Sequence, residues 1–201
     1  MTDPSPASHP DSDALPEDVP YIVATTRWLE RAVIGLNLCP FAKAVHVRRQ
    51  IHYAVCPGSD DADLMEALIF EAKELAALSP SARDTTLVIA PNTLADFLDF
   101  HDFTRRAERR LARAGFGGVF QLASFHPRFE FAGHASSDIA NATNRAPYPT
   151  LHLLREDSVS RAVQAFPEAE AIFERNIATL EALGAEGWAM LDVGPGGAGR
   201  A

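Results

Sequence analysis

Three of the seven histidines lie between positions 126 and 152, namely His126, His134 and His152. An unperturbed imidazole titrates near pH ~6.5, which suits proton transfer at neutral pH. The same stretch holds Glu130 and Asp138, whose carboxylates could orient an imidazole as in a catalytic triad. We interpret His126 and His152 as a candidate acid and base, with Glu130 or Asp138 orienting one of them. The alternative is that the histidines hydrogen-bond locally and hold the loop.

Arginines accompany these histidines at positions 128, 145 and 155. A guanidinium group can bind phosphate or carboxylate through two parallel hydrogen bonds, which lysine cannot do. Asn144 and Tyr148 flank Arg145 and would add polar contacts. The pattern predicts a site for a small anionic metabolite, formed by Arg128, Asn144, Arg145, Tyr148 and Arg155. The same arginines could instead pin a long loop through carboxylates and backbone carbonyls.

Cys39, in "NLCPFAK", stands before a proline at the end of a helical pattern. A thiolate there would be a nucleophile if a cation or a helix N-terminus lowered its pKa. The second cysteine that dithiol chemistry requires is absent, because Ala42 occupies that position. Cys39 is therefore interpreted either as a nucleophile or as a buried wall of the site.

Metal binding is a weaker alternative for the same histidines. His126, His134 and His152 are acceptable zinc or iron ligands, but no compact His-x-x-x-His or Cys-x-x-Cys spacing is present. We predict no metal, and these three residues as its ligands if one binds. The sequence indicates neither a cofactor nor an oligomeric state.

The elements that must position these residues alternate between helical and strand patterns. Helices are expected at 21–38, 60–78, 93–115, 158–166 and 169–184, and strands at 47–55, 85–91, 118–125 and 149–156. This order predicts a single layered α/β (or α+β) domain with about four strands covered by helices. The first three strands are expected to be parallel. The fourth can pair either way, which leaves a ferredoxin-like sandwich open.

The candidate chemistry falls mainly in residues 126–149, a long ordered insert before the last strand. Its aromatic and aliphatic residues allow it to pack, and long loops in compact domains are commonly functional. At the chain ends, residues 1–20 read as a disordered acidic, proline-rich leader and residues 191–201 as a flexible glycine-rich tail. The single domain is thus expected at 21–190.

The composition limits the classes of partner. The net charge of −9 over 201 residues argues against nucleic acid or an anionic membrane as the partner. A face of five arginines, Arg105, Arg106, Arg109, Arg110 and Arg113, is interpreted as a solvated helix face rather than a phosphate-binding one. With no signal-peptide pattern and two cysteines, we expect a reduced, cytoplasmic protein.

Four segments, "GLNLCPFAK", "ASFHPRFEFAG", "NATNRAPYPTLHLLRE" and "DSVSRAV", resemble in this order a bacterial family known as domain of unknown function 1415. The resemblance covers about residues 21–185 and implies neither substrate nor mechanism. The residues themselves favour a cytosolic enzyme that acts on a small anionic metabolite by histidine-assisted hydrolysis or group transfer. A non-catalytic small-ligand sensor and a protein-interaction module are the alternatives.

Overall fold

A four-stranded mixed sheet lies at the centre of the computed structural model, which describes residue 15 and residues 17–165 and 171–195. The strands are β1 (Ile51–Val55), β2 (Thr85–Ile89), β3 (Phe120–Phe125) and β4 (Thr150–Arg155). Their spatial order is β1-β2-β4-β3, with β1 and β2 parallel and β4 antiparallel to both of its neighbours. The first three strands therefore point the same way, and the last one lies inside the sheet.

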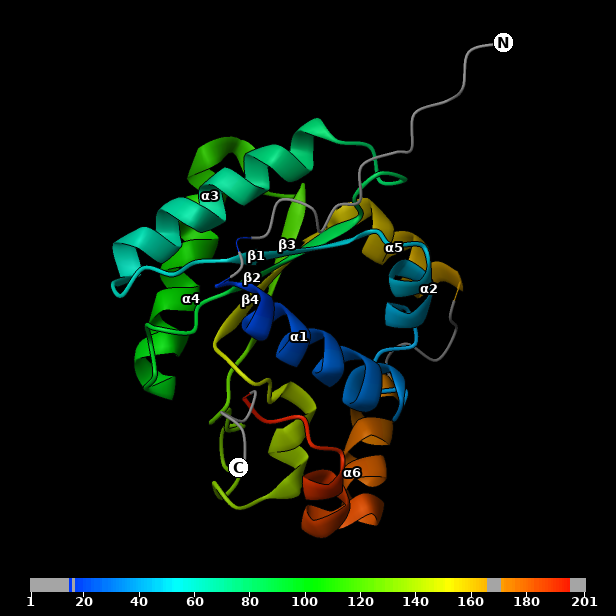
Figure 1. Ribbon diagram of the computed structural model, residues 1–201. Helices are drawn as coiled ribbons and strands as arrows, with labels where there is room; N and C mark the ends of the chain where they lie inside the picture. The colour runs from blue at the N-terminus through cyan, green and yellow to red at the C-terminus, as the bar shows by residue number, and fades with distance from the viewer. Residues whose placement is uncertain (1–14, 16, 166–170, 196–201) are drawn as a thin grey trace.

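One face of the sheet is covered by α3 (Asp61–Ala77) and α4 (Phe97–Leu111), as Figure 1 shows. Val88 and Leu153 point toward these helices, because successive strand residues face opposite sides of a sheet. The helices supply apolar side chains at helical spacing to the same cluster, including Leu64, Leu68, Leu75, Phe100, Phe103 and Ala107. This layer is the larger part of the hydrophobic core.

Aspartates begin both of these helices. The side chain of Asp60 accepts a hydrogen bond from the Asp63 amide at 2.8 Å, and that of Asp96 accepts one from the Leu98 amide at 2.9 Å. Such caps satisfy amides that have no partner inside the helix. The sequence placed the start of the second helix at Thr93. That prediction is wrong, because Asp96 is the cap.

The other face of the sheet carries α1 (Val19–Trp28), which continues as a π-helical stretch, η1 (Leu29–Ile34). The Trp28 ring meets the Phe125 ring of β3 edge to face, with 5.0 Å between centroids. A short helix that the sequence patterns did not reveal, α2 (Ala42–Val47), follows on the same side. The sheet is therefore enclosed by helices on both faces.

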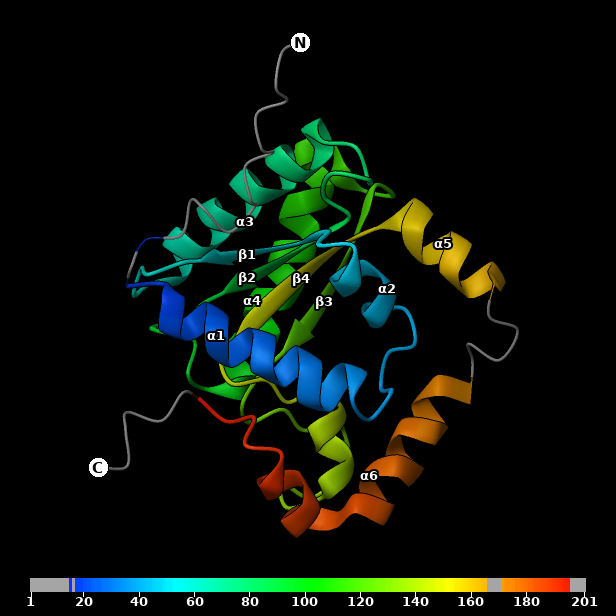
Figure 2. The same cartoon turned by 45° about the vertical axis from the view of Figure 1, so that its right-hand side comes forward.

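The insert is ordered and packs against the C-terminal helix α6 (Ile172–Met190), which lies below the sheet in Figures 1 and 2. It contains one 3-10 helix, η3 (Ile139–Asn144). Ala142 of η3, Leu38 and Leu180 of α6 form a small separate hydrophobic cluster. Two further helical elements are η2 (Ala112–Phe116), a π-helical segment that continues α4, and α5 (Glu156–Ala165), which starts directly after β4.

The predicted fold class, an α/β domain with four strands and a long ordered insert, is confirmed. A ferredoxin-like sandwich is not formed, since a helix joins β2 to β3 and β1 pairs directly with β2, whereas in a ferredoxin-like sheet another strand lies between them. Helical order begins at Val19, inside the predicted leader, and Val193 is buried with 5% of its surface exposed, inside the predicted tail. Residues 1–14 and 16 of the predicted leader and residues 196–201 of the predicted tail lie outside the described residues.

None of the helices in the described part of the chain is both long enough and apolar enough to cross a membrane.

Candidate functional site

His126, which directly follows β3, is buried, and both of its ring nitrogens form hydrogen bonds. Only 1% of its surface is exposed, and its ring lies against the rings of Phe97 and Phe100 in α4. Its Nε2–H donates to the Leu94 carbonyl at 3.0 Å, while its Nδ1 accepts from the Arg128 amide at 3.0 Å. Burial lowers the pKa of the imidazole, so the ring stays neutral. Neither nitrogen is left to exchange a proton with a substrate.

Arg128 continues this attachment. Its guanidinium group donates to the Ala95 carbonyl and lies 3.3 Å from a carboxylate oxygen of Asp96, the cap of α4. Hydrogen bonds from the Leu98 and Asp99 amides are the main reason that the pKa of Asp96 is lowered, with Arg128 a smaller cause. The first residues of the insert therefore fasten it to the start of α4.

His152 lies on the opposite face of the sheet. Its neighbour Leu153 packs toward α3 and α4, so His152 points toward α1, where its ring lies 6.3 Å from that of Phe125. The Thr85 hydroxyl donates to the Leu153 carbonyl at 2.6 Å and accepts from His152 Nε2–H at 2.5 Å. Desolvation lowers the pKa of His152 to about 4. The predicted approach of His126 and His152 therefore does not occur.

Arg155 is at the other end of β4 from the insert. Its guanidinium group donates to the carbonyls of Leu75, Leu78 and Arg83, at 2.6, 2.7 and 3.1 Å. These bonds satisfy the C-terminal carbonyls of α3 and the turn after it. Burial lowers the pKa of Arg155. The predicted convergence of Arg155 with Arg145 on one anion is wrong, because the two side chains are fixed at opposite ends of the sheet.

Arg145 remains inside the insert. Its Nε–H donates to the Phe129 carbonyl at 3.3 Å and its terminal nitrogen to the Ser136 carbonyl at 2.7 Å. A guanidinium group has about five N–H donors in all. Arg145 thus joins the two halves of the insert and keeps further donors for a ligand.

Three other predicted site residues have separate surroundings. The Asn144 carbonyl accepts from the His126 amide at 3.1 Å, which closes the insert at its base. The Tyr148 ring packs edge to face on Tyr21 of α1, with 5.2 Å between centroids. Glu130 is exposed, and no hydrogen bond or ion pair to its side chain occurs within the described residues. Glu130 therefore orients none of the histidines that the structure describes.

Cys39 is half-buried and packs against the cluster beneath α1. Desolvation raises the pKa of its thiol, and hydrogen bonds from the Phe41 and Ala42 amides oppose that rise only in part. A thiol that stays protonated at neutral pH is a poor nucleophile. Of the two roles predicted for Cys39, the nucleophile is disfavoured by this environment, and the wall of the site stays a prediction.

One constellation within the insert does combine a base, an orienting acid and a cation. His134 Nδ1–H donates to Asp138 Oδ2 at 2.8 Å, and Asp138 Oδ1 accepts from the Ala140 amide at 2.9 Å as the cap of η3. The Ala140 amide is the largest cause of the lowered pKa of Asp138, followed by His134 and, at longer range, Arg145. His134 Nε2 has no partner within the described residues, and 34% of the side chain is exposed.

Aromatic rings flank this constellation. The Phe131 ring lies 5.8 Å from the His134 ring and meets Phe173 of α6 edge to face at 5.4 Å. Phe173 is 49% exposed, so a substrate at His134 would find an apolar surface beside the polar groups. Sequence reasoning gave His134 only a conditional role as a metal ligand. The available signal was its position four residues before Asp138, within reach of one turn.

The conditional metal ligands are not brought together. His126 lies against α4, His152 faces α1, and His134 is in the middle of the insert. Across the residues that the structure describes, no group of three or more histidine, cysteine or acidic side chains is arranged to hold a metal ion.

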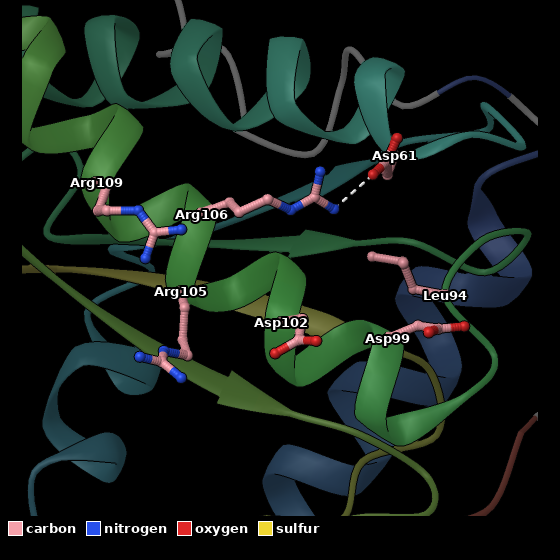
Figure 3. A pocket seen from close by; sticks show the side chains of 7 residues that line it. All are labelled: Asp61, Leu94, Asp99, Asp102, Arg105, Arg106 and Arg109. Atoms are coloured by element: carbon pink, nitrogen blue, oxygen red, sulfur yellow. Dashed lines mark hydrogen bonds and ion pairs between the residues drawn. The ribbon is translucent and has the colours of Figure 1, made fainter.

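The arginine-rich face of α4 lines a groove of about 660 Å³, shown in Figure 3. Arg106 makes an ion pair with Asp61 of α3, at 2.5 Å. Arg105 and Arg109 share the groove with Asp99 and Asp102. The charges therefore alternate, which agrees with the interpretation of this face as a solvated helix surface.

A family model described as "Protein of unknown function (DUF1415)" matches residues 21–190 of the chain. The chain belongs to this family. The match confirms the resemblance and extends from α1 to the last residue of α6, so the DUF1415 region includes the whole sheet and the insert. Neither the curated proteins nor the solved structures gave a match.

Proposed function

We propose that the protein is an enzyme that acts on a small anionic metabolite by histidine-assisted hydrolysis or group transfer, with His134 as the general base. The supporting observation is the 2.8 Å hydrogen bond between His134 Nδ1 and Asp138 Oδ2, which orients the ring and leaves Nε2 open on an exposed side chain. A carboxylate in this position selects one tautomer and stabilises the imidazolium ion that forms during proton transfer.

Each residue has a distinct role in this proposal. Asp138 stays ionised, because the lowered pKa of its carboxyl group keeps it charged at neutral pH. His134 Nε2 takes the proton from a water molecule or a hydroxyl group as its oxygen attacks the substrate, and then returns that proton to the leaving group. Arg145, already fixed by the Phe129 and Ser136 carbonyls, offers its remaining donors to the substrate anion.

The test measures turnover of p-nitrophenyl phosphate, p-nitrophenyl acetate and a panel of small phosphate esters and carboxylic esters. For a substrate that is turned over, His134→Gln is expected to reduce kcat by about 10²–10⁴-fold. His101→Gln is the matched control, since His101 is another exposed histidine, on α4. Equal rates for the wild type and both variants would reject His134 as the base.

A non-catalytic ligand-binding role is the second candidate, and the fixed guanidinium group of Arg145 favours it as well. If the protein only binds its ligand, the wild type and the His134→Gln variant should bind inorganic phosphate with equal affinity. The Arg145→Gln variant should lose that binding. We further propose a cytoplasmic location, which the two free cysteines Cys39 and Cys56 support. The net charge of −9 argues against nucleic acid and anionic membranes as partners, whereas a local guanidinium group such as that of Arg145 would still attract a small anion.

A further inference from the structure

A second pocket lies at the end of the sheet opposite the insert. It has a volume of about 450 Å³ and is lined by residues of α2, of α5 and of the turn before β2. Figures 1 and 2 both show α2 and α5 side by side there. The insert leads into Thr150, which pairs with the last residue of β2, whereas Asp84 in the pocket precedes the first. The pocket is therefore independent of His134.

Two motifs that are distant in the sequence meet in this pocket. The segment "GLNLCPFAK" contributes Pro40 and Phe41, and the segment "DSVSRAV" contributes Ser158, Arg161 and Ala162. The proposed enzymatic role uses neither segment. Both segments therefore line the same pocket.

A chain of hydrogen bonds fixes the polar wall. Arg161 donates to the Ser158 hydroxyl at 3.0 Å, and that hydroxyl donates to Asp84 Oδ1 at 2.6 Å. On the α2 side, Arg48 is exposed, and its guanidinium group has no hydrogen-bond or ion-pair partner among the described residues. The pocket thus holds two guanidinium groups against one carboxylate, in a chain whose net charge is −9. This local excess of positive charge selects an anion.

The remaining wall is apolar. Phe41 and Val45 from α2 and its approach face Ala162 of α5, and all three are partly buried. Such surfaces favour a compact hydrophobic group, while a few polar side chains set its orientation. A free inorganic anion would leave this wall unused.

We propose that the pocket between α2 and α5 binds a small amphipathic anion, with a carboxylate or phosphate head held by Arg48 and Arg161 and an apolar body against Phe41, Val45 and Ala162. The Arg161–Ser158–Asp84 chain sets the position of the Arg161 guanidinium group.

The experiment follows backbone amide shifts by NMR while benzoate, phenyl phosphate, inorganic phosphate or benzyl alcohol is added to the full chain. We expect benzoate or phenyl phosphate to shift the Ala44, Ser158 and Ala162 amides saturably, with a Kd on the order of millimolar for ligands of this size. The better of these two ligands identifies the head group. Inorganic phosphate and benzyl alcohol each lack one half of the ligand and should bind more weakly.

Arg48→Gln and Arg161→Gln are each expected to weaken binding by about 5–10-fold, as the loss of one ordinary hydrogen bond at a solvent-exposed site would. Arg113→Gln, a change at an exposed arginine after α4, should leave binding unchanged. Both pocket arginines are exposed, so the variants should fold, and circular dichroism verifies this.

Three results would overturn the proposal: no saturable shift at these amides, unchanged affinity in both pocket variants, or inorganic phosphate binding as tightly as phenyl phosphate. His134→Gln should not alter the titration. A failure of the proposed enzymatic role therefore leaves this result unaffected.

Discussion

The two strands that flank the insert and the turn in its middle use similar residues in opposite ways. On or directly beside the strands, polar side chains form hydrogen bonds with backbone groups and with a hydroxyl group of the protein itself, as His126, His152 and Arg155 do. In the turn, His134 is oriented by Asp138 but keeps one ring nitrogen open. Polar residues on or directly beside these strands thus stabilise the fold, whereas His134 keeps an unused ring nitrogen and is the residue suited to chemistry.

The largest expected effect on stability is at His126. His126→Ala removes two hydrogen bonds and a ring packed between Phe97 and Phe100, which should lower the free energy of unfolding by about 3 kcal/mol. His134→Ala, at an exposed position, should change it by less than about 0.5 kcal/mol. Urea unfolding of both variants provides the measurement. Similar losses would remove the distinction between the two regions.

The pH dependence of stability should come from the strands. The pKa of His152 is about 4 in the folded protein, below its ordinary value of ~6.5, so the unfolded chain binds a proton that the folded chain does not. The contribution of the neutral His152 ring to the free energy of unfolding is therefore fully present above pH ~6.5. It falls as the pH drops toward about 4, by up to about 1.4 kcal/mol per pH unit.

His126 has a lowered pKa too and adds to the same fall. In His152→Gln, the free energy of unfolding should fall less steeply between pH ~6.5 and about 4 than in the wild type. At pH 8 it should change little, because the glutamine amide can still donate to Thr85. Thermal unfolding at pH 8, 6 and 5 tests this. An unchanged slope in the variant would count against the desolvated environment of His152.

Arg155→Gln should have the next largest effect, a loss of about 2 kcal/mol, since it removes bonds to the Leu75 and Leu78 carbonyls at the end of α3. Hydrogen exchange of amides in the last turn of α3 should accelerate along with it. The matched control is Arg113→Gln, because Arg113 is exposed and has no partner in the described residues. An arginine that served only a ligand would leave both measurements unchanged.

The smallest effect concerns the tautomers of two histidines. At pH 8, long-range nitrogen–proton NMR spectra should show His126 protonated on Nε2 and His134 protonated on Nδ1, because their hydrogen-bond partners require opposite forms. Asp138→Asn is expected to reduce the Nδ1–H population of His134 and leave His126 unaltered. Identical tautomers in the wild type would contradict the proposed orientation of His134.

The sequence predicted the larger elements well because each carries a repeated local signal. α3 and α4 have apolar residues at helical spacing and acidic caps, and β2 is a short buried apolar run. α2 was missed because its six residues include none that is buried, so no amphipathic stripe marks it. The insertion of β4 between β2 and β3 depends on pairing between distant segments, for which local spacing holds no signal.

The candidate site shows the same limit. The sequence identified the insert and its residue types, and it left open whether the arginines bind an anion or pin the loop. Arg128 and Arg155 prove to bind backbone carbonyls, which no residue type or spacing could indicate. Asp138 was recognised as an orienting acid, but its partner is His134, since the turn between them brings the two side chains together.

The position of β4 also bears on how the chain reaches its fold during synthesis. β2 and β3 hydrogen-bond to β4 and not to each other, so neither can complete its pairing until the ribosome has released residues 150–155. A nascent chain shorter than this would expose two unpaired strand edges, which favours aggregation. We therefore expect fragments that end before Thr150 to be insoluble, whereas chains that extend past β4 can close the sheet.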